Sequence, residues 1–233
     1  ADALQRFTAQ AMKDWNYILE LRSRELKVGG RLLTVNLSRD EEGRYLGHNG
    51  GETRNVHDQL HQIWHAMAEE GLINAEQYKQ GTVLNFYKSP EEFMAPLKDE
   101  SSPAYRNGLR LVDERTVYVK CPYRRRWNEN GDTAAFAAGL MATIRSWSRH
   151  SFASAAGDAA ADTVYERLQQ RIAETPSEWS LDYVEHHQMM EKVAELDISK
   201  TFASKSYDLG PDGSGPDGTR NDDVNHDHWS CSL

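Results

Sequence analysis

The sequence has few cysteines, no long apolar run and no excess of positive charge. Its two cysteines, Cys121 and Cys231, lie far apart, so a structural disulfide is not expected and a reducing compartment is favoured. No apolar stretch approaches the roughly 18 to 20 residues that a transmembrane helix needs, and the first residues lack a basic-then-apolar signal pattern. We therefore expect a cytoplasmic protein without a membrane partner.

The charge balance excludes a second class of partner. Lys and Arg number 27 against 36 Asp and Glu, which gives a formal net charge of −9. Such a chain is not expected to bind nucleic acid or an anionic membrane through a dominant electrostatic interaction. The basic cluster "YRRRW", Tyr123 to Trp127, is interpreted as a solvated turn, with a local anion contact as the alternative.

What the sequence does contain is enough apolar residue for a core. With 233 residues, of which 39% are hydrophobic, it can form one large domain or two small ones. From about Asp197 the composition changes to mainly Gly, Asp, Asn and Ser, as in "LGPDGSGPDGTRNDDVNHDHW". Such a segment has too little apolar surface to offset the loss of chain entropy on folding. Residues 196–233 are therefore predicted to be disordered.

The first part of the chain has the pattern of an α/β unit. Apolar residues recur at helical spacing over residues 3–27 and predict one long helix, which Gly29 and Gly30 end because glycine adopts left-handed conformations at little cost. The near-continuous apolar run "RLLTVNLS" follows and predicts a strand covered on both faces. The strand that would precede the helix in such a unit is missing from the chain.

A polar, Gly-rich segment, Arg39 to Asn55, follows this strand. In open α/β sheets, ligands bind where strands end. The glycines of "GHNGG" lack the Lys-Ser/Thr of a P-loop and the context of a GxGxxG turn, so no cofactor cradle is predicted. His57 lies next to the segment, in a helix predicted for about residues 56–70, and is a candidate pocket residue; a partly exposed polar helix face is the alternative.

The remaining segments predict mainly helices. "LRLVDERTVYVKCPY" is interpreted as two strands or as one long bent strand. Helices are expected at residues 133–150, 159–174 and 181–195. Adjacent His186 and His187 would point about 100° apart on a helix and could not share a metal unaided, so no metal site is predicted. Trp147 and His150 could supply an aromatic wall and a polar group to a pocket; burial of Trp147 in the core is the alternative.

Three segments carry a resemblance to a known family. They are "DWNYILELRSRELKVGGRLLTVNLSRD" (Asp14 to Asp40), "LHQIWHAMAEEGLI" (Leu60 to Ile73) and "FYKSPEEF" (Phe86 to Phe93). In motif, order and spacing they resemble the C-terminal half of the SABATH family, the salicylate, jasmonate and caffeine-type S-adenosylmethionine-dependent methyltransferases. The resemblance covers roughly residues 10–175.

The resemblance implies an α/β fold: the C-terminal part of a Rossmann-like seven-strand methyltransferase sheet plus an α-helical cap, with a disordered C-terminal tail. Residues 1–130 would form the C-terminal part of the core, with a cap helix inserted at about 56–70. Residues 131–195 would complete the helical cap. The strand at Leu32 to Leu37 would be the fifth of the sheet, and the region Leu109 to Val119 would supply the last two.

The resemblance also implies a chemistry. Family members transfer the methyl group of S-adenosylmethionine to a carboxylate or ring nitrogen of a small molecule, mainly by positioning in a shielded pocket. The family's cofactor site lies upstream of the matching segments, so this chain alone is expected to bind the cofactor poorly and to be inactive, and its catalytic residues stay unknown. A metal-associated family motif is not carried over at Lys79 to Thr82.

His57, Trp147 and His150 are the predicted acceptor-binding residues. By its place in the resemblance, His57 stands where plant members have a tryptophan near the acceptor, which implies a different or more polar acceptor. A non-catalytic α/β interaction module, derived from a truncated methyltransferase, is the alternative function. A homodimer is a further expectation, because a sheet without its central strands exposes an edge.

Overall fold

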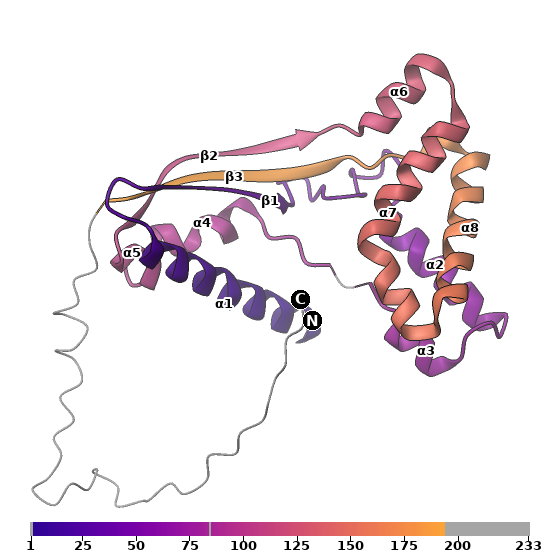
Figure 1. Ribbon diagram of the computed structural model, residues 1–233, viewed down its shortest axis with the longest axis horizontal. Coiled ribbons are helices and arrows are strands. Elements are labelled where there is room, and N and C mark those ends of the chain that lie inside the picture. Colours follow the sequence, from indigo (N-terminus) through magenta and orange to yellow (C-terminus); the bar gives the residue numbers. More distant parts are fainter. Residues whose placement is uncertain (1, 84, 194–233) are drawn as a thin grey trace, which may run out of the picture. The chain divides into compact units, whose positions relative to one another are not determined.

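The computed structural model describes residues 2–83 and 85–193, which belong to one compact unit. The predicted tail, residues 196–233, lies outside the described residues. The elements run in the following order (Figure 1): α1 (Asp2–Glu25), β1 (Arg31–Ser38), α2 (Val56–Glu69), α3 (Ala75–Gln80), α4 (Pro90–Lys98), α5 (Pro103–Arg106), β2 (Leu109–Val119), α6 (Pro122–Asn130), α7 (Thr133–Ala156), α8 (Asp158–Glu174), η1 (Pro176–Glu178) and β3 (Tyr183–Lys192).

The described strands form one sheet in the order β1-β3-β2, with both pairings antiparallel. The last strand in sequence is therefore the central one. The prediction of a helix at residues 181–195 was wrong: alternate residues of β3 are buried, with the period of two of a strand. Pairing on both sides overrides the weak local preference of this segment. A seven-strand sheet is not seen in the described part of the chain, which contributes three strands.

One face of the sheet is covered by α1, α4 and α5 (Figure 1). The core between them contains Trp15, Leu19, Phe93, Leu97, Ala104, Leu109 and Met190. The Trp15 indole N–H donates to the Phe93 carbonyl at 2.8 Å, and the two rings pack edge to face. The predicted long helix is thus confirmed as α1, and it is fixed to the sheet through its buried stripe.

The turn after α1 explains its two glycines. Gly29 has a φ of 78°, and its N–H donates to the Lys192 carbonyl at 2.7 Å. The Lys192 ammonium group is buried and donates to the Ser23 carbonyl at 2.6 Å. Glycine meets the positive φ without a Cβ penalty, so the end of α1 and the end of β3 are joined by backbone and side-chain bonds.

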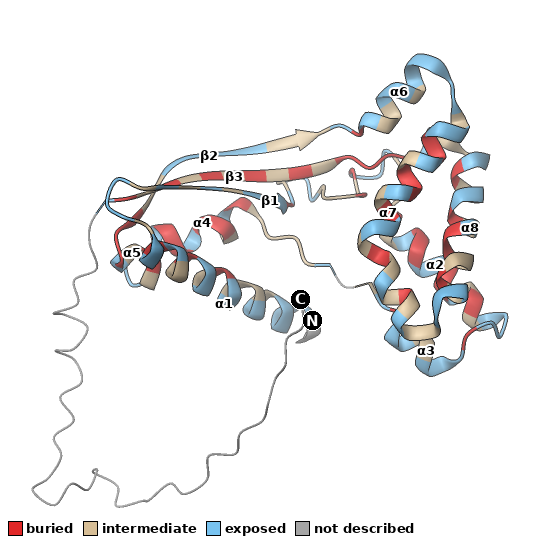
Figure 2. Ribbon diagram, viewed as in Figure 1, coloured by how far each residue is buried: buried red, intermediate tan, exposed pale blue. Residues whose placement is uncertain are grey.

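Strand β1 is not covered on both faces, and that prediction was wrong. Among the described strands it pairs with β3 alone, and its alternate residues Leu33, Val35 and Leu37 are 62%, 51% and 45% exposed. Figure 2 shows how exposed and half-buried residues are distributed along the described elements. For β2, one long bent strand is the correct alternative. Its register shifts between Leu111 and Asp113, which is the bend that a β-bulge produces.

The helices α2, α7 and α8 build a second core. Leu60, Ile63, Trp64 and Met67 of α2 are buried as the periodicity predicts, and they pack with residues such as Phe152 and Leu168. Gly81 allows this packing, because a Cβ there would lie 2.5 Å from the Trp64 ring. The helices predicted at 56–70, 133–150 and 159–174 are confirmed as α2, α7 and α8.

The segment "YRRRW" is part of α6 rather than a turn. Arg124 from this helix donates to three carbonyl oxygens in the α8–β3 connection: those of Pro176, Ser177 and Trp179, at 3.2, 2.7 and 2.7 Å. Its guanidinium therefore satisfies backbone acceptors of the protein itself. The connection that leads into β3 is held by this arginine.

Candidate functional site

A cavity of about 280 Å³ opens where four segments meet: the first turn of α1, the loop after β1, the first turn of α2 and the segment before α4. It is lined by Leu4, Arg39, Tyr45, His57, Val83, Asn85, Phe86 and Tyr87. Most of these side chains are aromatic or apolar, with Arg39 as the one cationic group among them. Such a mixture is typical of small-molecule sites.

The ring of His57 is held from both sides. Its Nε2 lies 3.1 Å from the Leu46 carbonyl oxygen, and its Nδ1 lies 3.2 Å from the Asn85 amide nitrogen. A carbonyl oxygen can only accept, so Nε2 carries the proton and Nδ1 accepts from Asn85. Burial lowers the pKa of His57, because desolvation disfavours the charged ring. The histidine is therefore a neutral member of the wall.

The start of α2 positions this ring. Asn55 caps the helix, and its side chain accepts hydrogen bonds from the backbone N–H groups of His57 and Asp58 at 3.0 and 3.4 Å. An N-cap of this kind fixes where the helix begins. The sequence therefore places His57 in the first turn, with its ring directed back to the Leu46 carbonyl.

Aromatic rings surround the histidine. Tyr45 and Tyr87 are stacked with centroids 4.9 Å apart and planes inclined by 20°. The His57 ring lies 5.9 Å from Tyr45, 6.2 Å from Tyr87 and 5.4 Å from Trp147. Burial raises the pKa of Tyr87 to about 12, so its phenol is neutral at physiological pH. We name Tyr45, His57, Tyr87 and Trp147 the aromatic cluster.

The structure brings two of the three predicted site residues together. Trp147 of α7 contacts His57, although it does not itself line the cavity. Its indole nitrogen is buried and has no hydrogen-bond partner in the described part of the chain. His150 is exposed, with the Ser154 hydroxyl of its own helix 3.4 Å away, and it is not among the residues that line the cavity. Acceptor binding by these residues stays a prediction.

Sequence reasoning missed Tyr45, Asn85 and Tyr87. Tyr45 belongs to the Gly-rich segment singled out as a ligand site, and Tyr87 belongs to "FYKSPEEF". Their positions in these two segments could have identified Tyr45 and Tyr87 as candidate site residues. Nothing in the sequence showed that Asn85 would face His57 across 28 positions.

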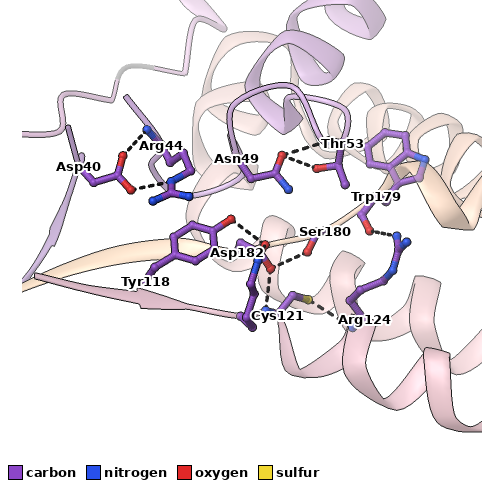
Figure 3. A network of polar contacts seen from close by, with 11 residues as sticks. Asp40, Arg44, Asn49, Thr53, Tyr118, Cys121, Arg124, Trp179, Ser180 and Asp182 are labelled. Atoms are coloured by element: carbon purple, nitrogen blue, oxygen red, sulfur yellow. Dashed lines mark hydrogen bonds and ion pairs between the residues drawn. The ribbon is translucent and has the colours of Figure 1, made fainter. Parts of the chain in front are cut away.

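A polar network, shown in Figure 3, involves residues of the loop after β1, residues of β2 and residues that precede β3. Its centre is Asp182, whose carboxylate accepts from the Ser180 hydroxyl at 2.7 Å and from the Cys121 N–H and Tyr118 hydroxyl at 2.8 Å. Burial alone would raise the pKa of Asp182, but these hydrogen bonds and the nearby Lys120 charge lower it. The network therefore depends on an ionised carboxylate.

The same residue reaches the loop through its backbone. The Gly47 N–H donates to the Asp182 carbonyl at 3.0 Å, and the Gly47 carbonyl accepts from Val56 at 3.0 Å. The loop is thus bonded on one side to the start of β3 and on the other to the start of α2. At its beginning, Arg44 donates to Asp40 at 2.6 Å and lies over the Tyr118 ring at 4.4 Å.

The sequence matches a family model described as SAM dependent carboxyl methyltransferase over residues 1–193. The chain belongs to this family. The predicted resemblance to the SABATH methyltransferases is therefore confirmed. A comparison with curated proteins found no significant match to the sequence.

Solved structures give the fold of this methyltransferase-family chain. Among 24 matching chains is a loganic acid methyltransferase with SAH, at 15% sequence identity and a TM-score of 0.60. The match covers 84% of this chain and 51% of the other. At this identity the likeness concerns the fold, and the chain spans about half the length of the solved methyltransferase.

The family implies S-adenosylmethionine, but the surroundings of Gly47 and Gly50 in the loop after β1 do not indicate a cradle for it. Gly47, with a φ of 73°, offers no space to a ligand, because a Cβ there would lie 3.0 Å from the Val56 side chain. Beside Gly50 the nearest group is the Arg44 side chain, at 3.7 Å. The positive φ of Gly47 and Gly50 accounts for glycine at these two positions without the close approach of a nucleoside. No step of the reaction is therefore assigned to cofactor contacts in this part of the chain.

None of the helices in residues 2–83 and 85–193 is both long and apolar enough to cross a membrane. Within the same residues, no three His, Cys, Asp or Glu side chains converge as a metal site would require. His186 and His187, which the wrong helix prediction placed about 100° apart, lie on opposite faces of β3 as successive strand residues.

Proposed function

We propose that this chain is the acceptor-side part of an S-adenosylmethionine-dependent carboxyl methyltransferase that methylates a carboxylate of a small molecule. The observation that carries the proposal is the aromatic cavity, in a chain whose family match extends over residues 1–193. The stacked Tyr45 and Tyr87 offer a flat apolar wall. Arg39 offers the cation that a carboxylate requires.

The chemistry asked of these residues is positioning. An ionised carboxylate is itself the nucleophile, so this part of the chain has no proton to remove. Holding it in the attack geometry and away from water supplies most of what catalysis needs. Arg39 lies 3.3 Å from Glu92 in an exposed ion pair. Such a pair is weak, so an acceptor carboxylate can compete with Glu92 for the guanidinium group.

The test is a methyl-transfer assay on the product of the natural open reading frame that contains these residues. We expect methyl esters and S-adenosylhomocysteine from at least one of a panel of small aromatic and aliphatic carboxylic acids. In the active protein, Arg39→Gln should raise the acceptor KM about tenfold or more, because a charge-assisted hydrogen bond is lost. Cofactor binding without methylation of any acid on the panel would contradict the proposal.

A second candidate function is a non-catalytic interaction module, which includes a homodimer. The exposed row Leu33, Val35 and Leu37 on an edge strand favours it, because apolar edges pair readily with other chains. Calorimetry with S-adenosylmethionine on the same natural product separates the two functions. Micromolar affinity would exclude the module, and sedimentation of the 233-residue chain would show whether β1 associates.

A further inference from the structure

We propose that His57 is a positioning residue: its neutral, Nε2-protonated ring ties two separate loop segments to α2 and thereby sets the spacing of the cavity walls. As a statement about acceptor selection, this inference rests on the proposed function. As a statement about the ring and the two loops, it rests on the geometry of the chain alone.

The two bonds of the ring reach different segments. Nε2 donates to Leu46, which is 11 positions away in the loop after β1, and Nδ1 accepts from Asn85, which is 28 positions away in the segment before α4. The stacked tyrosines lie next to these contacts in sequence, with Tyr45 beside Leu46 and Tyr87 two residues after Asn85. A bond to each loop therefore fixes the distance between the two tyrosine-bearing segments.

The same geometry leaves the His57 ring no free hydrogen-bonding group. Its only proton on nitrogen is used by Leu46, and its only lone pair is used by Asn85, since a neutral imidazole has one donor and one acceptor. It therefore has no free donor for an acceptor carboxylate and no free lone pair for a general base. Among the rings of the aromatic cluster, the unpaired buried N–H belongs to Trp147.

The next histidines on α2 provide a contrast. His61 and His65 follow at intervals of four residues on the same helix, and both are exposed. His65 has the Glu69 carboxylate as an ion-pair partner at 3.4 Å on its own helix. Neither lines the cavity. His65→Phe is therefore a matched control, because it makes the same chemical change on the same helix without touching the loops.

The first measurement is the tautomer. In the 233-residue chain labelled with ¹⁵N-histidine, long-range nitrogen–proton spectra should show His57 with a protonated Nε2 and an unprotonated Nδ1. The signal is assigned by its loss in His57→Gln. Asn85→Asp should convert His57 to the doubly protonated form near neutral pH, because a carboxylate in place of the amide favours the cation. A proton on Nδ1 in the wild type, or no response to Asn85→Asp, would overturn the inference.

The second measurement is the wall itself. Nuclear Overhauser contacts between the Tyr45 and Tyr87 rings should be lost in His57→Phe, which keeps a ring and deletes both bonds. They should persist in His57→Gln, whose amide can donate to Leu46 and accept from Asn85, and in His65→Phe. If His57→Phe does not fold, Asn85→Ala removes one bond from an exposed residue and should weaken the same contacts. Retention of the contacts in a folded His57→Phe, or unchanged contacts in Asn85→Ala, would overturn the inference.

Binding of benzoate, as a probe of the cavity, links the two hydrogen bonds of His57 to the proposed function. We expect its dissociation constant to rise about fivefold to tenfold in His57→Phe and to stay unchanged in His65→Phe. Equal affinity in wild type and His57→Phe would contradict a role in acceptor selection. Absence of benzoate binding by the wild type would count against the proposed acceptor class, while the tautomer and the ring contacts would still decide the role of His57.

Discussion

The two edges of the sheet are built differently. Strand β2 carries Asp113, Glu114 and Arg115 together at its middle, next to a bulge at the preceding residue. Strand β1, "RLLTVNLS", has no charged residue after Arg31 and no bulge. Charges and bulges are devices by which proteins protect sheet edges from pairing. The difference indicates that β2 is protected as an edge strand, whereas β1 lacks the features that would prevent another strand from pairing with it.

The difference between the two edge strands agrees with the family match of the chain. A chain that spans about half of a solved methyltransferase has one protected edge and one unprotected edge. The exposed apolar row of β1 is then surface that the proposed enzyme would bury.

The largest effect is expected from a matched pair of leucines on the two edge strands. Leu109 of β2 is fully buried, and Leu33 of β1 is 62% exposed. Leu109→Ala should reduce the free energy of unfolding by about 2–5 kcal/mol, because it leaves a cavity in the core. Leu33→Ala should change it by less than about 0.5 kcal/mol. Urea denaturation measures both, and similar losses would mean that β1 is already covered in this chain.

The second prediction concerns Asp182, whose carboxylate accepts a hydrogen bond from Tyr118 of β2. Asp182 stabilises the fold in its ionised form, and its pKa is lowered from the ordinary value. A carboxyl with a lowered folded pKa stabilises above its unfolded pKa, and this contribution is lost as the pH falls through the folded value. Asp182→Asn should cost about 1–3 kcal/mol at pH 7 and flatten the decline in stability below about pH 4. Exposed Asp113→Asn is the control, and an unchanged acid profile in Asp182→Asn would refute the assignment.

The third prediction tests whether the edges differ in association. Val35→Lys places a charge in the exposed row of β1, and Val112→Lys makes the same change at the bulge of β2; the two valines are 51% and 50% exposed. Each should alter stability by less than about 0.5 kcal/mol. Concentration-dependent association, followed by sedimentation velocity, should decrease only in Val35→Lys. An equal decrease in both variants would remove the distinction between the edges.

The smallest effect is expected for the ion pair across β1 and β3. Arg31 lies 3.1 Å from Glu191, and its side chain is 64% exposed. Exposed pairs contribute about 0–1 kcal/mol and are screened by salt. Arg31→Ala should therefore reduce stability by at most about 0.5 kcal/mol in low salt, with no measurable loss in 1 M salt. A larger, salt-independent loss would show that Arg31 stabilises β1 through packing.

Much of the helical part could be predicted from the sequence. In α2, buried residues recur at helical spacing and Asn55 provides a cap, so local signals agree with the packing. The central strand could not be predicted in this way. Its buried face includes His186, Gln188 and Lys192, which are unusual core residues. Their burial depends on distant partners, as when Lys192 donates to Ser23 across 169 positions.

The candidate site could likewise be predicted only where it depends on local sequence signals. Its location followed from a Gly-rich segment after a strand, and His57 followed from its position beside that segment. The engagement of both ring nitrogens could not be foreseen, because it depends on how two loops return to α2. The exposed face of β1 was also missed: an apolar run cannot distinguish a strand buried on both faces from an edge strand whose cover lies on another part of the fold.

The most direct test of the account is transfer of a labelled methyl group from S-adenosylmethionine to small carboxylic acids by the natural protein that contains these residues. We predict a labelled methyl ester, at least about tenfold less turnover in Tyr87→Ala, and unchanged turnover in Tyr17→Ala, whose ring is 60% exposed on α1. Equal loss in both variants, or methylation that is unaffected by Tyr87→Ala, would contradict it.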